Sequence, residues 1–213
     1  MKRIYLDYNA TTPLDSRVLD EMIPYLKNNY GNPSSIHSYG NKAKAALDES
    51  RDRVSDFIRA RPGEIVFTGG GSESNNFAIK GSAFSLREKG NHLITVSTEH
   101  ASCLEVFRFL EKRGFEVTYV SVDKFGLVNL DELQNSIKSN TILISCMYVN
   151  NETGVINPIN KIGEIAGENN ILFHSDMVQA AGKIEIDISA LPLDLASFSS
   201  HKIYGPKGVG ALY

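Results

Sequence analysis

Blocks of apolar and polar residues alternate along the chain, and from about residue 64 onward they predict strands and helices in turn. Strands are predicted at residues 64–68, 92–97, 115–122, 141–149, 171–174, 193–198 and 209–213. Helices are predicted at residues 72–89, 101–113, 131–138 and 160–169. Within the second of these helices, Leu104, Phe107 and Leu110 recur every three residues and form the apolar stripe that packs a helix on a sheet.

Several strands are apolar on both faces, as the run Ile142-Leu143-Ile144 shows. A strand of this kind is buried between two layers of helices. We therefore expect an α/β fold with a mainly parallel sheet, helices on both faces and right-handed helical crossovers. Ligands of such sheets bind beyond the carboxyl ends of the strands, so the functional site is expected at strand-to-helix turns.

Upstream of this unit, residues 42–59 read as an amphipathic helix and residues 30–40 as a loop rich in turn-forming residues. No linker or repeat divides the chain, which predicts one large domain over residues 1–213. The last strand pattern ends at Tyr213 with nothing after it to cover the sheet. We therefore expect a further, C-terminal part of the fold to be missing.

The composition excludes several classes of protein. With 42% apolar residues, 22% charged residues and a net charge of −3, the chain is typical of a globular protein and has no strong field that would attract nucleic acid or an anionic membrane. Its apolar runs are far shorter than the roughly 18 residues that a membrane span needs. The two cysteines exclude a disulfide framework, and together with the absence of a secretory signal pattern they favour the cytoplasm.

A glycine-rich turn, FTGGGSESN, occupies residues 67–75 between a predicted strand and a predicted helix. Backbone N–H groups of such a turn approach an anion closely, and the helix dipole adds attraction for phosphate. Ser72 is followed by Glu73 rather than by lysine, so the turn is not a P-loop. The alternative, a flexible turn with a serine N-cap, stays open at this point.

A second candidate is Asp176, which comes just past the apolar strand at residues 171–174. A buried carboxylate there needs a cationic partner, and a protonated ring nitrogen of a heterocyclic cofactor would serve. Gln179, three residues further on, would offer an amide to the same pocket. The alternative makes Asp176 a helix N-cap and Gln179 a surface residue.

The third candidate is the segment around Lys202, which precedes a turn at Gly205-Pro206. A partly desolvated lysine is neutral more often and so is a better nucleophile, which suits a Schiff base. If the preceding strand extends through this segment, Ser199 and His201 lie on one side of it. The alternative is an ordinary solvated lysine.

Metal and thiol chemistry have weaker support. His100 with Cys103, and His174 with Asp176, each supply two ligands without a recognisable zinc motif. Cys146 lies within an apolar strand and is expected in the core. Cys103 lies early in a predicted helix, where the helix N-terminus would lower the pKa of a thiol. The glycine-rich turn also lacks the Gly-x-Ser-x-Gly pattern of a serine nucleophile.

At residues 200–213 the chain reads SHKIYGPKGVGALY, and it carries further motifs at residues 5–13 (YLDYNATTP), 30–37 (YGNPSSIH), 98–100 (TEH) and 149–154 (VNNETG). In these motifs the whole chain resembles the cysteine desulfurases, the NifS/IscS-like branch of the class V aminotransferase superfamily. The resemblance implies the large domain of a fold type I enzyme that depends on pyridoxal 5′-phosphate (PLP). It also implies that Lys202 holds this cofactor as a Schiff base.

The same resemblance implies the other contacts to PLP. The phosphate is expected on the turn at Gly71 and Ser72, with help from Ser199 and His201. At the ring, the resemblance places Asp176 on the pyridinium nitrogen, Gln179 on the phenolic oxygen, His100 stacked on the ring as an aid to proton transfer, and Asn151 on the cofactor or the substrate carboxylate.

The implied reaction converts L-cysteine into L-alanine and a persulfide on a catalytic cysteine. The implied partners are a sulfur acceptor, such as an iron–sulfur scaffold or a tRNA-thiolation protein, and a second copy of the chain in a homodimer. In the family, the catalytic cysteine, its mobile loop and the arginine that binds the substrate carboxylate lie beyond the position of Tyr213, and neither Cys103 nor Cys146 matches the catalytic position.

Two hypotheses follow from this departure. The lineage is that of an enzyme, whereas the 213-residue chain alone is expected to be a PLP-binding module without turnover. Another class V reaction, such as selenocysteine lysis or transamination, is a lesser alternative because the cofactor site is shared.

Overall fold

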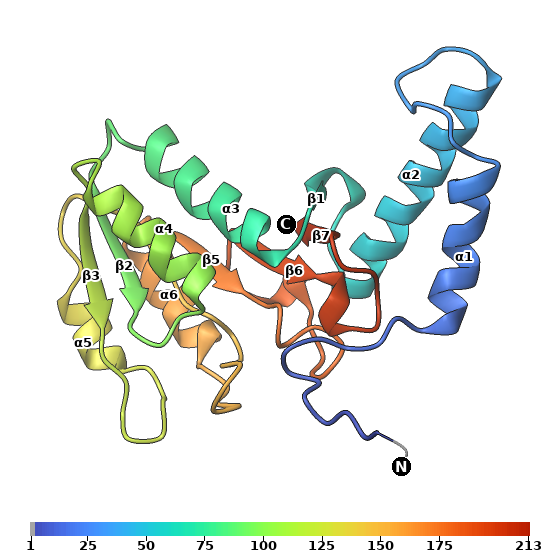
Figure 1. The fold of residues 1–213 in the computed structure, drawn as a ribbon. Coiled ribbons are helices and arrows are strands. Elements are labelled where there is room, and N and C mark those ends of the chain that lie inside the picture. The colour runs from blue at the N-terminus through green and yellow to red at the C-terminus, as the bar shows by residue number, and fades with distance from the viewer. Residues whose placement is uncertain (1–2) are drawn as a thin grey trace.

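The computed structural model describes residues 3–213 and shows a seven-stranded sheet with helices on both faces (Figure 1). The strands are β1 (Val66–Thr68), β2 (His92–Val96), β3 (Glu116–Val120), β4 (Thr141–Ser145), β5 (Leu172–Asp176), β6 (Leu195–Ser199) and β7 (Gly210–Leu212). The α-helices are α1 (Ser16–Lys27), α2 (Ser38–Ile58), α3 (Gly71–Ser85), α4 (Ala101–Glu111), α5 (Leu130–Asn135) and α6 (Ile159–Glu168). Short 3₁₀ turns are η1 (Pro62–Glu64), η2 (Ile188–Ala190) and η3 (Ser200–Lys202).

The strand order is β1-β7-β6-β5-β4-β2-β3. Strands β2 to β6 pair in parallel, whereas β7 runs antiparallel to both of its neighbours, β1 and β6. The segment after η3, with turns at residues 203–204 and 207–208, reverses the chain between β6 and β7, so β7 returns beside β6. The prediction of a mainly parallel α/β sheet is confirmed, with one antiparallel strand inserted near its edge.

Each central strand buries both of its faces. Leu93 of β2 and Leu143 of β4 lie in one core cluster, together with residues of α3 and α4. Their neighbours Ile94 and Ile144 lie in a second cluster, which includes residues of α6 and the C-terminal end of α2. Because successive side chains of a strand point to opposite faces, the continuous apolar runs serve both layers.

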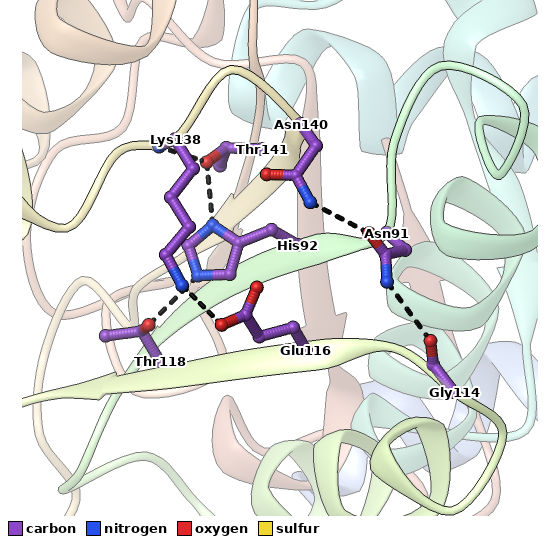
Figure 2. A network of polar contacts seen from close by, with 8 residues as sticks. All are labelled: Asn91, His92, Gly114, Glu116, Thr118, Lys138, Asn140 and Thr141. Carbon is purple, nitrogen blue, oxygen red and sulfur yellow. Dashed lines mark hydrogen bonds and ion pairs between the residues drawn. The ribbon is translucent and has the colours of Figure 1, made fainter.

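A buried imidazole joins three strands at the amino-terminal ends of β2, β3 and β4 (Figure 2). His92 of β2 lies with Nδ1 2.7 Å from Oγ1 of Thr141 and Nε2 2.9 Å from Oγ1 of Thr118. Burial lowers the pKa of His92, and the nearby Lys138 ammonium lowers it further. A neutral ring therefore links the threonines of the two flanking strands.

His174 does the same in the middle of the sheet. Its Nδ1 lies 2.9 Å from Oγ of Ser145 on β4, and its Nε2 lies 2.9 Å from Oγ of Ser197 on β6. Full burial lowers the pKa of His174 to about 3. With both ring nitrogens bonded to serines, His174 acts as a neutral structural crosslink.

The N-terminal third differs from the sequence-based expectation. Helix α1 was not predicted, and α2 begins at Ser38 rather than at residue 42, within the predicted loop. The ring of His37 caps α2, because its Nδ1 accepts a hydrogen bond from Gly40 N at 3.4 Å. Gly40 is required here, since a Cβ on it would lie 2.1 Å from Ser35 O.

The end of the sheet also differs. Asp176 was expected just past the strand, but it is the last residue of β5. Strand β6 ends at Ser199. Ser200 begins the turn η3, because its Oγ donates to Val209 O at 3.0 Å and its carbonyl accepts from Gly205 N at 2.9 Å. His201 therefore lies in a turn, and the expectation that it shares a strand face with Ser199 is wrong.

The helices of residues 3–213 include none that combines the length and the apolar composition needed to cross a bilayer.

The buried His174 predicts acid-sensitive stability. Its pKa in the folded protein, about 3, is below the unfolded value of 6.5, so the unfolded chain binds more protons between these limits. Stability is then lost as the pH falls below 6.5, at about 1.4 kcal/mol per pH unit from this residue. Urea unfolding from pH 7 to pH 4 should show a shallower pH slope for His174→Asn than for the wild type; equal slopes would contradict this account.

Candidate active site

A cavity of about 980 Å³ opens at the carboxyl ends of the parallel strands, beside the N-termini of α3 and α4. The nine site residues predicted from the sequence all line it: Gly71, Ser72, His100, Asn151, Asp176, Gln179, Ser199, His201 and Lys202. They come from five separate segments, at or after the ends of β1, β2, β4, β5 and β6. The structure thus brings all nine together, while the role of each stays a prediction.

The glycine-rich turn delivers the N-terminus of α3 to this cavity. Gly70 has φ of 146° and is the N-cap, so the alternative of a serine cap is wrong. Gly71 lets the helix approach the turn after β5, because a Cβ there would lie 2.7 Å from Cγ2 of Val178. The N–H groups of Gly71, Ser72 and Glu73 have no acceptor within residues 3–213. Free donors at a helix N-terminus form an anion site.

Asp176 is buried and lines the cavity. Its Oδ1 accepts from Val178 N at 2.9 Å, and its Oδ2 accepts from Asn75 Nδ2 at 2.8 Å. Burial raises the pKa of Asp176, while these two donors and the nearby His100 and Lys202 act in the other direction. Asp176 begins no helix, so the N-cap alternative is wrong, and the carboxylate is held as an acceptor for a further cation.

Gln179 is also buried, which rules out the surface alternative. Its Oε1 accepts from Lys183 Nζ, and its Nε2 donates to Asn9 O at 2.9 Å. Because an ammonium only donates, Lys183 fixes the orientation of the Gln179 amide: the oxygen points towards Lys183, and the NH₂ group points towards Asn9 O.

Lys202 presents its amine at the same place, donating from Nζ to Asn9 O. Burial lowers the pKa of Lys202, and the carboxylates of Asp176 and Asp7 partly oppose this. A lowered pKa increases the neutral fraction of the amine, as covalent chemistry with an aldehyde requires.

The segment from Asn9 to Thr12 makes hydrogen bonds to the lysine turn, residues 200–204, which includes Lys202. Both N and Oγ1 of Thr12 donate to His201 O at 2.9 Å, and Tyr204 N donates back to Thr12 Oγ1 at 2.8 Å. Thr11 Oγ1 lies 3.0 Å from Nδ1 of His201. Burial and the charges of Lys202 and Lys207 lower the pKa of His201. The N-terminal segment therefore forms one wall of the cavity, although Thr11 lies 190 residues before His201 in the sequence.

His100 is the N-cap of α4, and its Nδ1 accepts from Ser102 N at 3.1 Å. Asn151 is presented by the loop after β4. In that loop Oδ1 of Asn150 accepts from the N–H groups of the second and third residues beyond it, both at 2.9 Å, and its Nδ2 donates to Thr98 O at 3.0 Å. These bonds tie the loop to the β2–α4 turn and bring the two predicted site residues to one cavity.

Glu99 and Cys103 lie buried behind the cavity. Glu99 accepts from Met147 N, and its burial, together with the charge of Asp176, raises its pKa to about 8. Burial raises the pKa of Cys103 as well, so the prediction that the helix N-terminus lowers it is wrong. Desolvation outweighs the helix dipole here because the thiol is fully enclosed. Cys146 is fully buried in the core, as predicted.

Residues 3–213 contain no cluster of three or more histidine, cysteine, aspartate or glutamate side chains arranged to hold a metal ion. The two pairs considered from the sequence are occupied in other ways. Both nitrogens of His174 bond to serines, and Nδ1 of His100 bonds to Ser102.

The donor set fits PLP. A helix N-terminus with unpaired N–H groups suits the phosphate, and a buried carboxylate suits a protonated ring nitrogen. An amine of lowered pKa lines the same cavity and suits an aldehyde. Gly71 leaves the room that a Cβ would fill.

Sequence reasoning missed several lining residues, among them Asn75, Ser102, Asn9 and Lys207. Asn75 follows Gly71 by four residues and so shares its helix face, a signal that the sequence already contained. Asn9 acts through its backbone carbonyl, which no side-chain pattern reveals.

The buried Glu99 predicts a loss of stability as the pH rises from 4.5 to about 8. Its folded pKa of about 8 exceeds the unfolded value of 4.5, so the folded state binds the extra proton, and stability falls between these limits by about 1.4 kcal/mol per pH unit. Glu99→Gln keeps a neutral acceptor and should flatten this slope in urea unfolding at pH 6, 7 and 8. The exposed Glu168→Gln is the control, and parallel curves for all three proteins would refute the assignment.

Comparison with known proteins agrees with the geometry. A family model described as aminotransferase class-V matches residues 4–213. The chain is similar to "Cysteine desulfurase IscS" of Clostridium botulinum (strain Hall), with 51% identity over 212 residues, all of this chain and 53% of the relative. It is 52% identical to the protein of the same name from Dictyoglomus turgidum, over 214 residues and 54% of that relative. The chain thus spans about half the length of the curated relatives it matches.

Two solved structures are similar over nearly the whole chain. "SspA in complex with cysteine" has a TM-score of 0.96 and 45% identity, covering 99% of this chain and 61% of that one. "NIFS-LIKE PROTEIN" has a TM-score of 0.97 and 41% identity, covering 100% of this chain and 59% of that one. Fold, cavity and sequence agree: the chain belongs to the aminotransferase class-V family of PLP-dependent enzymes.

Proposed function

We propose that this cavity holds PLP and that the whole protein is a cysteine desulfurase, which converts L-cysteine into L-alanine and passes the sulfur on as a persulfide. The observation that carries the proposal is the meeting, in one cavity, of the Lys202 amine, the buried Asp176 carboxylate and the free N–H groups of α3. The names of the relatives and the cysteine-bound neighbour support the choice of substrate.

Different lining residues would contact different parts of the cofactor. Gly71 and Ser72 supply backbone donors to the phosphate, assisted by the Ser199 hydroxyl and by His201. Their donors replace the water that a phosphate would otherwise bind. Because the phosphate is anchored, the rest of the cofactor is oriented towards Asp176.

At the other end, Asp176 keeps a negative charge beside the ring nitrogen, and the Gln179 amide, fixed by Lys183, donates towards the phenolic oxygen. Bound PLP supplies an electron sink for the carbanion left when the substrate loses its Cα proton. Lys202 would hold the aldehyde through Nζ, and as a free amine the same nitrogen would carry that proton. His100 and Asn151 line the same cavity, where His100 would stack on the ring and Asn151 would position the cofactor or the substrate carboxylate.

Neither cysteine of this chain suits the step that accepts sulfur. Cys103 and Cys146 are fully buried, and burial raises the pKa of both thiols well above the ordinary value. A sulfur-accepting cysteine needs an exposed thiolate. The 213-residue chain by itself is therefore expected to bind PLP without turnover, and the acceptor of the sulfur in the whole protein is an iron–sulfur scaffold or a tRNA-thiolation protein in the cytoplasm.

Substitution of Lys202 and substitution of Asp176 should each weaken PLP binding, in different ways. Lys202→Ala should abolish the visible absorbance of the covalent adduct while phosphate binding persists. Asp176→Asn should weaken binding about 100-fold, since a buried cation would lose its partner. Absorbance titration with PLP measures both, and the exposed Lys89→Ala and Asp131→Asn serve as matched controls. An adduct that forms equally well in Lys202→Ala would refute the assignment.

The same preparation tests turnover. With L-cysteine and PLP, the isolated chain should release alanine and sulfide no faster than free PLP does, whereas the complete protein should release both. Robust turnover by the 213-residue chain would contradict the account of Cys103 and Cys146.

A homodimer is the second part of the proposal. Helix α1 buries none of its residues, and large apolar side chains are exposed along the N-terminal third, with Leu6 87% and Ile36 96% exposed. Figure 1 shows this region projecting from one end of the sheet. Surfaces of this kind mark association sites. Light scattering at micromolar concentration should give about twice the chain mass, with Ile36→Glu shifting the protein towards monomer; a wild-type monomer would contradict the proposal.

A further inference from the structure

Asn75 lies at the junction of two groups that the proposed function uses separately. It is 1% exposed, and its Nδ2 lies 2.8 Å from Oδ2 of Asp176 and 2.9 Å from Oγ of Ser102. Ser102 Oγ in turn lies 2.8 Å from Nδ1 of His100. A continuous chain of hydrogen bonds therefore runs from the buried carboxylate, through α3 and the first turn of α4, to the imidazole.

The direction of each bond follows from the chemistry of its ends. Asp176 accepts, so Asn75 must turn its NH₂ group towards the carboxylate, because the reversed amide would set two oxygens against each other. The second N–H of the same group donates to Ser102 Oγ. Having received that hydrogen bond, Ser102 has its own hydroxyl hydrogen left for Nδ1 of His100.

The Ser102 backbone supplies an independent constraint. Its N–H lies 3.1 Å from Nδ1 of His100 and, like every backbone N–H, it can only donate. Nδ1 therefore receives two donors and carries the lone pair. A neutral imidazole with its lone pair on Nδ1 has its proton on Nε2. No residue within 3–213 bonds that nitrogen, and His100 lines the cavity.

We propose that Asn75 and Ser102 are positioning residues that hold His100 as the Nε2–H tautomer and couple it to Asp176. The catalytic meaning of this inference rests on the proposed function, whereas the tautomer itself does not. In this state Nε2 offers a hydrogen bond to an oxygen of a ligand in the cavity. His100 is thereby a donor to the substrate or cofactor, and it has no free lone pair with which to act as a base.

The tautomer is directly measurable. In protein labelled with ¹⁵N-histidine, without cofactor, two-bond proton–nitrogen correlations identify the unprotonated nitrogen of each of the five histidines, and His100→Gln assigns the signal in question. We expect Nδ1 of His100 to be the unprotonated nitrogen. Ser102→Ala removes one neutral donor and should lower the Nε2–H to Nδ1–H ratio about fivefold. Ser102→Thr keeps the hydroxyl and should restore it.

Asn75→Leu tests the coupling, with Asn140→Leu as the matched control. Asn140 is a partly buried asparagine whose Nδ2 donates to Asn91 Oδ1 at 2.8 Å (Figure 2). It lies just before the amino-terminal end of β4, whereas the cavity lies at the carboxyl ends of the strands. Asn75→Leu should lower the tautomer ratio, and Asn140→Leu should not. Combined with Ser102→Ala, Asn75→Leu should have little further effect, because Asn75 acts on His100 only through Ser102.

Three results would overturn the proposal: a wild-type His100 protonated on Nδ1, an unchanged ratio in Ser102→Ala, or additive effects in the double variant. Ser102 is partly exposed in the first turn of α4, so its variants remain informative even if Asn75→Leu fails to fold. A tautomer that shifts as expected in a protein that does not bind PLP would leave this inference standing and remove the proposed function.

Discussion

The site depends on a carboxylate kept charged in the interior. Asp176 is the last residue of β5, where burial penalises its negative charge. Two hydrogen-bond donors and the Lys202 ammonium act against that penalty. They come from three places in the chain: Asn75 from α3, Val178 from the turn after β5, and Lys202 from η3. The position of α3, the lysine turn and the His100 turn around one carboxylate follows from this need.

The scaffold that holds these segments is itself crosslinked by polar groups. His92 and His174 are neutral, buried and bonded on both ring nitrogens to hydroxyls of the flanking strands. Fully satisfied groups of this kind cost little to bury and specify which strands are neighbours. The strands thereby keep the register that places their carboxyl ends, and so the cavity walls, side by side.

Burial has opposite consequences for the ionisable groups around the cavity. It lowers the pKa of Lys202, which favours a reactive amine, but it raises the pKa of Cys103 and Glu99 and so keeps both neutral. Burial therefore makes the Lys202 amine more reactive, and it keeps the Cys103 thiol and the Glu99 carboxyl group unreactive. The selectivity of the site for amine chemistry arises from depth within the fold as much as from residue identity.

Much was determined by the sequence alone. Runs such as Ile142-Leu143-Ile144 indicated a sheet covered on both faces. The glycines at 69–71 favoured an anion site at a helix N-terminus without excluding a flexible turn, and the motif around Lys202 indicated the family, because each pattern depends on neighbouring residues only. Tertiary structure decided the rest. Asn75, Ser102 and the carbonyl of Asn9 gain their roles from partners up to about 190 residues away, and Cys103 is inert because the fold encloses it. Burial and long-range hydrogen bonds are properties of the packed molecule, so no local pattern specifies them.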